Sequence, residues 1–113
     1  MSDSPTLDST VAVVTGASSG IGEATALALA AQGATVALVA RRAQRLERLA
    51  EQIASVGPTP LVIAADLTDA AQPPRVMSEV VAKAGRIDVL VNNAGVMLLG
   101  PIVGAPLDAP EVV

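Results

Sequence analysis

Short runs of apolar residues, many of them β-branched, recur four times along the chain. They occupy residues 11–14, 35–39, 61–64 and 87–91. Runs without regular polar alternation are typical of strands that are buried on both faces of a sheet. The hydrophobic pattern therefore predicts four buried strands.

The segments between these runs have the composition and spacing of helices. Residues 20–32 are rich in alanine, which has the highest helix propensity. Within residues 43–55, apolar side chains recur at intervals of three and four positions, at Leu46, Leu49, Ala50 and Ile53. A looser apolar face follows Pro73 and Pro74, which are tolerated in the first turn of a helix. Three helices alternating with four strands predict an α/β fold with a parallel sheet, built from right-handed βαβ units.

The two ends of the chain lack this pattern. Residues 1–8 are mostly polar, and we expect them to form a flexible N-terminal tail before a single domain over residues 9–96. Beyond this domain, glycine and proline interrupt the chain at Gly100, Pro101, Gly104, Pro106 and Pro110. Residues 97–113 are therefore predicted to be an irregular loop.

Composition narrows the possible functions mainly by exclusion. Of the 113 residues, 51% are hydrophobic and 16% charged, which is enough apolar material for one core. The chain has no cysteine and no histidine, so we expect neither a disulfide framework nor a metal site. The formal net charge of −4 argues against nucleic acid or an anionic membrane as a partner. Without a basic leader segment or cysteine, the chain is expected to be cytoplasmic.

One uncharged stretch, residues 24–40, approaches the length of a membrane span. Gln32 and Gly33 divide it, and alanine dominates its first half. We interpret it as a buried helix followed by a buried strand, and we expect no membrane association.

A glycine-rich turn directly follows the first strand: Thr15-Gly16-Ala17-Ser18-Ser19-Gly20-Ile21-Gly22. A strand, glycine loop and helix in this order present unpaired N–H groups and the positive end of the helix dipole to a phosphate. The three glycines permit a tight turn and close approach of a ligand, and the two serines could donate to a phosphate. We therefore expect a dinucleotide to bind at Gly16, Ser18, Ser19, Gly20, Ile21 and Gly22. Taken alone, the motif also fits an ordinary strand-to-helix turn.

Two arginines follow the second strand, at the place where an NAD-binding fold carries a carboxylate. That carboxylate stands about 20 residues after the glycine loop and binds the ribose 2′-hydroxyl. Here Ala40 occupies the position, and Arg41 and Arg42 follow it. Guanidinium groups bind phosphate through charge-assisted hydrogen bonds, each contributing about 1.5–3 kcal/mol. NADP(H) is therefore expected as the preferred cofactor and NAD(H) as the second choice, although the arginines could also be a solvated first helical turn.

Two further polar motifs follow the third and fourth strands. They are Asp66-Leu67-Thr68-Asp69 and Asn92-Asn93-Ala94-Gly95. Without their context, the first could be a turn in which Asp69 caps the next helix, and the second an asparagine–glycine turn. Open parallel sheets bind ligands at the carboxyl ends of their strands, and all four motifs lie there. We therefore expect the four motifs to form one site.

In this order, the four motifs resemble those of the short-chain dehydrogenases/reductases, a family of NAD(P)-dependent oxidoreductases. The resemblance covers about residues 8–104 and implies the first half of a Rossmann-type, three-layer fold, with four strands in order 3-2-1-4 and three helices. It also implies that Asp66 and Leu67 hold the adenine, and that Asn93, Ala94 and Gly95 line the pocket near the nicotinamide ribose. Many NADP-preferring relatives carry a basic residue where this chain has Ser19.

The catalytic groups that the resemblance implies have no counterpart here. The family uses a tyrosine, a lysine four residues later, a serine and an asparagine, whereas this sequence has no tyrosine and a single lysine, Lys83, on a predicted helix. No catalytic residue is assigned, and the chain alone is expected to be inactive. Its complete form would transfer hydride between nicotinamide and a small carbonyl or alcohol substrate. The alternatives are a non-catalytic nucleotide-binding or assembly module, or a truncated fragment without function.

The fourth strand is expected to lie at an open edge of the sheet, where a fifth strand would otherwise pair with it. Unpaired backbone groups at such an edge favour pairing with another chain. We therefore expect self-association, or a partner chain, along residues 89–91.

Overall fold

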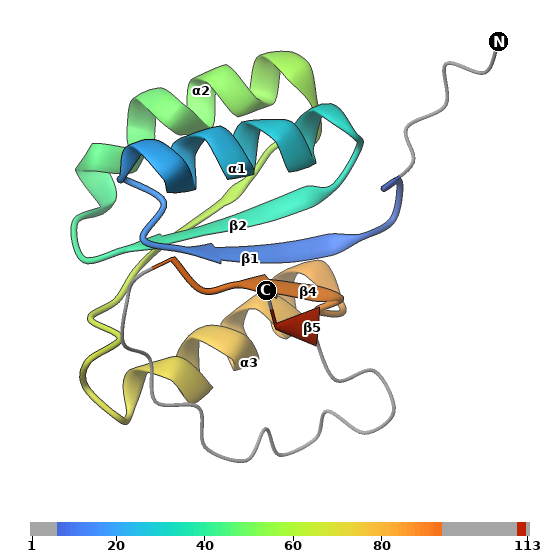
Figure 1. The fold of residues 1–113 in the computed structure, drawn as a ribbon. Coiled ribbons are helices and arrows are strands. Elements are labelled where there is room, and N and C mark those ends of the chain that lie inside the picture. Colours follow the sequence, from blue (N-terminus) through green and yellow to red (C-terminus); the bar gives the residue numbers. More distant parts are fainter. Residues whose placement is uncertain (1–6, 94–110, 113) are drawn as a thin grey trace, which may run out of the picture.

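A parallel sheet with helices on both faces forms the described part of the chain, residues 7–93 and 111–112 of the computed structural model (Figure 1). The strands are β1 (Val11–Thr15), β2 (Thr35–Ala40), β3 (Leu61–Ala64), β4 (Val89–Val91) and β5 (Glu111–Val112). The helices are α1 (Gly20–Ala31), the 3₁₀ helix η1 (Ala43–Leu46), α2 (Glu47–Val56) and α3 (Gln72–Ala84). Helices α1 and α2 cover one face of the sheet, and α3 covers the other (Figure 1).

The strand order is β3-β2-β1-β4-β5, and every neighbouring pair is parallel. The predicted order of the first four strands and the Rossmann-type architecture are confirmed. In the register of the central pair, Val11 lies opposite Thr35 and Thr15 opposite Val39. The carboxyl ends of β1 to β4 consequently meet at one edge of the sheet, where the four polar motifs begin.

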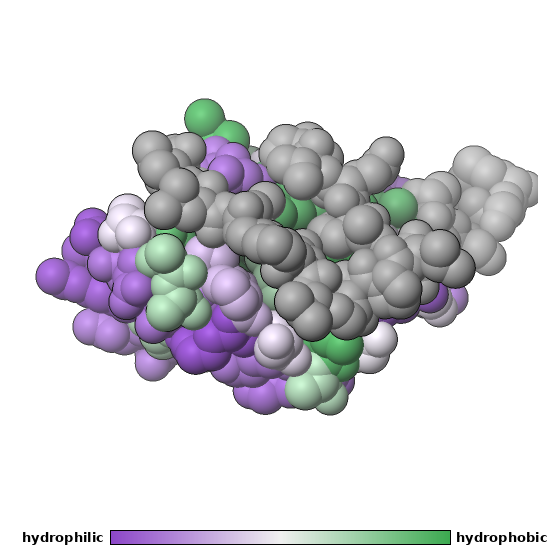
Figure 2. All heavy atoms as spheres, turned by 90° about the horizontal axis from the view of Figure 1, so that it is seen from below, coloured by the Kyte–Doolittle hydropathy of each residue, from purple (hydrophilic) through white to green (hydrophobic). Residues whose placement is uncertain are grey.

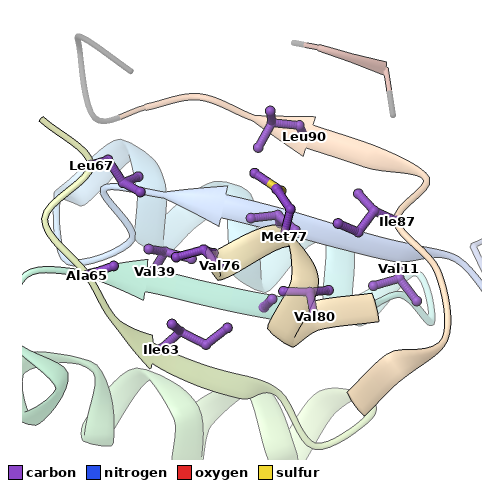
Figure 3. Close-up of a cluster of buried hydrophobic side chains, with 12 residues drawn as sticks. Val11, Val39, Ile63, Ala65, Leu67, Val76, Met77, Val80, Ile87 and Leu90 are labelled. Carbon is purple, nitrogen blue, oxygen red and sulfur yellow. The ribbon is translucent and has the colours of Figure 1, made fainter. Parts of the chain in front are cut away.

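Alternating residues of the central strands build two separate cores. Val11 and Val39 face α3 and pack in one buried cluster with Val76, Met77 and Val80 of that helix (Figure 3). The alternate positions of β1 and β2 pack against α1 and α2; this second cluster includes Val14, Leu38, Ala26, Ala30, Leu49 and Ile53. Because both faces are covered, the strands need no polar alternation.

Small residues let α1 approach its neighbours closely. The buried positions of α1 are Gly22, Ala26 and Ala30. A Cβ added at Gly57, after α2, would lie 2.2 Å from the carbonyl oxygen of Ala30. This contact explains why glycine follows α2.

The predicted open edge of β4 is the main correction to the fold. Val89 pairs with Glu111 and Leu90 with Val112, so β5 occupies that edge. These two residues fall in the stretch that the sequence assigned to an irregular loop. A two-residue strand after Pro110 carries no readable pattern, whereas the unpaired N–H and C=O groups of β4 favour such a partner. The remaining predictions for residues 94–110 and 113 lie outside the described residues.

The predicted tail is also shorter than expected. The N–H of Leu7 donates to the carbonyl oxygen of Gln32 at 2.8 Å. The side chain of Leu7 packs against the buried cluster that lies under α1 and α2. The structured part therefore includes residues 7 and 8, and residues 1–6 lie outside the description. Within the described residues, no helix has both the length and the hydropathy that crossing a membrane requires.

Three charged residues of α3 form a network on its outer side. Glu79 forms ion pairs with Arg75 at 3.3 Å and with Lys83 at 3.0 Å, each with a spacing of four residues. On this face the described residues are mostly hydrophilic, with small separate apolar areas (Figure 2). Lys83 is therefore a solvated helix residue.

Candidate functional site

A cavity of about 400 Å³ lies at the carboxyl ends of the strands. Its lining comes from the end of β2 and from the loops that follow β1 to β4: Gly16, Ser18, Val39, Ala40, Arg41, Ala65, Asp66, Leu67, Thr68 and Asn93. Six of these are predicted site residues: Gly16, Ser18, Arg41, Asp66, Leu67 and Asn93. The predicted residues Ala94 and Gly95 lie outside the described residues. The fold thus brings segments that are far apart in the sequence to one hollow, as the sheet topology requires.

The loop between β1 and α1 is closed by its own backbone. Gly16 has φ of 61°, in the left-handed region that glycine adopts without strain, and its carbonyl oxygen accepts the N–H of Ser19 at 3.1 Å. A Cβ added at Gly22 would lie 2.4 Å from that same carbonyl oxygen. Gly16 and Gly22 are therefore required by the fold itself, whether or not a ligand binds.

Gly20 and Ile21 differ from Gly16 and Gly22, because no contact in the described fold requires a glycine at position 20 or an apolar side chain at position 21. A Cβ added at Gly20 would meet no atom within 4 Å, and this glycine has no positive φ. Ile21, beside it in the first turn of α1, leaves 74% of its surface exposed. The open space leaves the backbone of this first turn accessible, and the unpaired N–H groups and dipole of the helix favour an anion there.

The Ser19 hydroxyl joins the loops after β1 and β4. It donates to the carbonyl oxygen of Gly16 at 2.9 Å and accepts from the N–H of Gly22 at 3.2 Å, so Ser19 caps α1. It also accepts from Nδ2 of Asn93 at 2.9 Å. With its single proton used, Ser19 could donate to a phosphate only by releasing Gly16, whereas Ser18 is exposed at the cavity.

Thr15 makes a second connection between these loops, a role that was not predicted from the sequence. Its Oγ1 accepts the N–H of Asn93 at 2.9 Å and donates to Oδ1 of Asn92 at 3.1 Å. The residue has no exposed surface, so these bonds satisfy a fully buried hydroxyl. The sequence feature that could have identified Thr15 is a single hydroxyl side chain at the end of an apolar strand.

The two arginines occupy different places. Arg41 lines the cavity, whereas Arg42 is not among its lining residues. Arg42 precedes η1, and its carbonyl oxygen accepts the N–H of Arg45 at 3.2 Å. Both side chains are exposed. The expected pair of guanidinium groups is therefore represented at the cavity by Arg41.

The turn after β3 holds an ionised carboxylate at the cavity. Oδ1 of Asp66 accepts from the hydroxyl of Thr68 at 2.6 Å and from its N–H at 3.0 Å. The side-chain bond, followed by the backbone bond, lowers the pKa of Asp66 below its usual value, and the nearby Arg41 charge contributes in the same direction. Asp66 therefore carries a negative charge beside Arg41 at neutral pH.

The other residues of this turn support it. Leu67 is 5% exposed and lies in the buried cluster that packs against α3, where it anchors the turn (Figure 3). Asp69 accepts the N–H of Ala71 at 3.0 Å, whereas the N-cap residue of α3 is Ala71 itself, without a side-chain bond. Asp69 thus stabilises the turn before the helix instead of capping α3, because a cap at position 69 would start the helix at residue 70, two residues before its observed start at Gln72.

The comparisons with known proteins agree with this arrangement. The family model of the short chain dehydrogenases matches residues 10–109. A short chain dehydrogenase of Pseudocercospora fijiensis is 42% identical over 102 residues, which cover 90% of this chain and 33% of that protein.

Two crystal structures show similar folds and contain different cofactors. A metagenomic short-chain oxidoreductase in complex with NADP has a TM-score of 0.75 and 44% identity, over 80% of this chain and 41% of that one. An NAD⁺-bound xylitol dehydrogenase has a TM-score of 0.76 and 34% identity, over 80% of this chain and 35% of that one. The chain thus spans less than half the length of each of these proteins.

Proposed function

This chain belongs to the short-chain dehydrogenase family, and from that premise we propose that it forms the NADP(H)-binding part of an oxidoreductase. The observation that carries the proposal is the cavity into which the loops after β1, β2, β3 and β4 all converge. In its complete form, such an enzyme would transfer hydride between nicotinamide and a carbonyl or alcohol carbon.

The pyrophosphate would bind at the start of α1. The space over Gly20 admits a phosphate close to the backbone, and the helix dipole favours its negative charge. Ser18 supplies an exposed hydroxyl at the cavity, and Ile21 would cover the ligand with apolar surface. Ser19 is proposed to act in the same loop, mainly through the shape that its three hydrogen bonds impose.

The adenosine half would bind between Arg41 and the turn after β3. Asp66 would accept the exocyclic amine of adenine, next to Leu67. Arg41 would bind the 2′-phosphate of NADP(H), and this single contact would favour NADP(H) over NAD(H) by about tenfold after screening at an exposed site. Arg42 would contribute only by turning toward the cavity.

The nicotinamide half would bind toward the end of β4. Asn93, whose backbone and side chain are both held by the loop after β1, is proposed to line this part of the pocket together with Ala94 and Gly95. When bound, the cofactor supplies the hydride chemistry. The residues of this chain bind and orient it, and with no tyrosine in the sequence they offer no group for proton transfer to the substrate oxygen.

A nucleotide-binding module without catalysis is the second candidate function, because the groups that line the cavity are suited to binding and orienting a dinucleotide. We further propose a cytoplasmic setting and self-association through the ends of the sheet. Among the described residues, β3 and β5 each pair with only one strand, which supports association at these edges.

Calorimetric titration with NADP⁺ and NAD⁺ tests the proposal. We expect both to bind, with NADP⁺ about tenfold tighter, and no NADPH oxidation with a panel of aldehydes and ketones. Absence of binding by either dinucleotide would refute a cofactor role. Turnover by the chain alone would show that it supplies catalytic groups that we have not assigned.

A further inference from the structure

Thr68 lines the cavity, and the sequence assigned it no individual role in binding. Its hydroxyl and its backbone N–H both donate to the same carboxylate oxygen, Oδ1 of Asp66, at 2.6 Å and 3.0 Å. Among the described residues, no hydrogen bond ends on Oδ2. One oxygen of Asp66 is thus held by the protein while the other remains available.

We propose that Thr68 is a positioning residue for adenine recognition, whose hydroxyl holds Oδ1 of Asp66 so that Oδ2 is presented to the exocyclic amine of the base. The inference rests on the proposed function, because it assumes that an adenine nucleotide occupies the cavity. It goes beyond that function by assigning the selectivity between purine bases to a pair of residues.

The geometry gives Thr68 this role because the terminal torsion of an aspartate is broad and nearly two-fold. Asp66 is exposed, so without a partner its carboxylate would rotate and present either oxygen to a ligand. Two donors from one residue on one oxygen remove that freedom before the ligand arrives. Ordering the group in advance reduces the entropy lost on binding.

The backbone around the pair is fixed independently. Leu67, between the two residues, is buried in the same cluster as Val76 of α3. The N–H of Ala65, before them, donates to the carbonyl oxygen of Ala40 at 3.0 Å and extends the pairing with β2. The hydroxyl of Thr68 therefore acts on the orientation of Asp66, while the core sets the position of the turn.

The charges around Asp66 act in the same direction. The side-chain bond and then the backbone bond from Thr68 lower the pKa of Asp66, and the charge of Arg41, which follows β2, contributes in the same direction. Asp69 lies in the same turn, but its Oδ1 accepts the N–H of Ala71. An ionised Asp66 accepts hydrogen bonds through both oxygens, and an amine donor is the ligand group that it favours.

The test compares NADP⁺ with deamino-NADP⁺, in which an oxygen replaces this amine and the adjacent ring nitrogen carries a proton. The unsubstituted chain is expected to bind NADP⁺ at least about tenfold more tightly than deamino-NADP⁺, because a hydrogen bond to a charged group is lost. Thr68→Val keeps the shape but removes the hydroxyl, and the ratio is expected to fall to about threefold or less. Thr68→Ser should restore it.

Thr59→Val is the matched control, because Thr59 is an exposed threonine in the connector between α2 and β3. This variant should bind both dinucleotides as the unsubstituted chain does. A Thr68→Val chain with an unchanged NADP⁺ to deamino-NADP⁺ ratio overturns the inference. If the unsubstituted chain binds neither dinucleotide, the proposed function fails and the inference fails with it. If it binds both and only the ratio in Thr68→Val is unchanged, the inference fails and the proposed function stands.

A second measurement does not depend on ligand binding. The Asp66 carboxyl carbon can be titrated by NMR in the ligand-free chain. Thr68→Val is expected to raise the Asp66 pKa, and Thr68→Ser to leave it where it is in the unsubstituted chain. An unchanged Asp66 pKa in Thr68→Val would show that the hydroxyl does not hold the carboxylate, and would also overturn the inference.

Discussion

The two ends of the cavity are built on different principles. At the glycine-rich end, the loops after β1 and β4 are connected by a partly buried hydrogen bond between Asn93 and Thr15 and an exposed one between Asn93 and Ser19. At the other end, Arg41 and Asp66 are exposed, and Asp66 is held by its neighbour Thr68. The first end therefore belongs to the folded framework, whereas substitutions at the second can change ligand selectivity with little effect on stability.

The largest effect is expected within the glycine loop, from Gly22→Ala. Its Cβ would lie 2.4 Å from a backbone oxygen that cannot move aside easily, so the free energy of unfolding should fall by about 2–3 kcal/mol. Urea denaturation measures this change.

Gly20→Ala is the matched control for that substitution. Because a Cβ at Gly20 meets nothing within 4 Å, the free energy of unfolding should stay within about 0.5 kcal/mol. Equal losses of stability in the two variants would contradict the distinction drawn between these glycines.

A smaller effect, confined to binding, is expected at the exposed end. Arg41→Ala should leave stability nearly unchanged and remove the preference for NADP⁺ over NAD⁺, a change of about tenfold in the ratio of their dissociation constants. Arg42→Ala should leave that ratio unchanged, because Arg42 does not line the cavity. Loss of the preference in Arg42→Ala alone would reverse this assignment.

The smallest effect concerns acid stability. The pKa of Asp66 is lowered in the folded chain from a reference value of 3.8, so its stabilising contribution is present above that value. The contribution should be lost as the pH falls through the lower, folded-state pKa. Urea unfolding from pH 5 downward should show a slightly weaker acid dependence in Asp66→Asn than in the unsubstituted chain, and an identical dependence would contradict the shift.

Much of the framework was predictable because it follows from local patterns. Continuous apolar runs identified the strands, and a motif after each of them located the site at one edge of the sheet. The two-residue strand β5 was not predictable, because its pairing depends on unsatisfied backbone groups of β4, far away in the sequence.

Within the site, the sequence identified residue types but not their partners. Arg41 and Arg42 are chemically alike and adjacent, yet only Arg41 lines the cavity. Ser19 carries a hydroxyl that could donate to a phosphate. In the structure this hydroxyl already donates one hydrogen bond and accepts two from neighbouring groups. Thr15 and Thr68 were passed over because a hydroxyl becomes informative only when its partner is known.

The sequence by itself determined the alternation of strands and helices, and it determined which chemical groups stand at the strand ends. Both are properties of short segments, set by hydrophobic periodicity and by the conformations that glycine allows. Only the tertiary structure decided which of those groups face the cavity and which bond to each other. Those choices depend on side-chain directions and on contacts between residues more than 70 positions apart, such as Ser19 and Asn93.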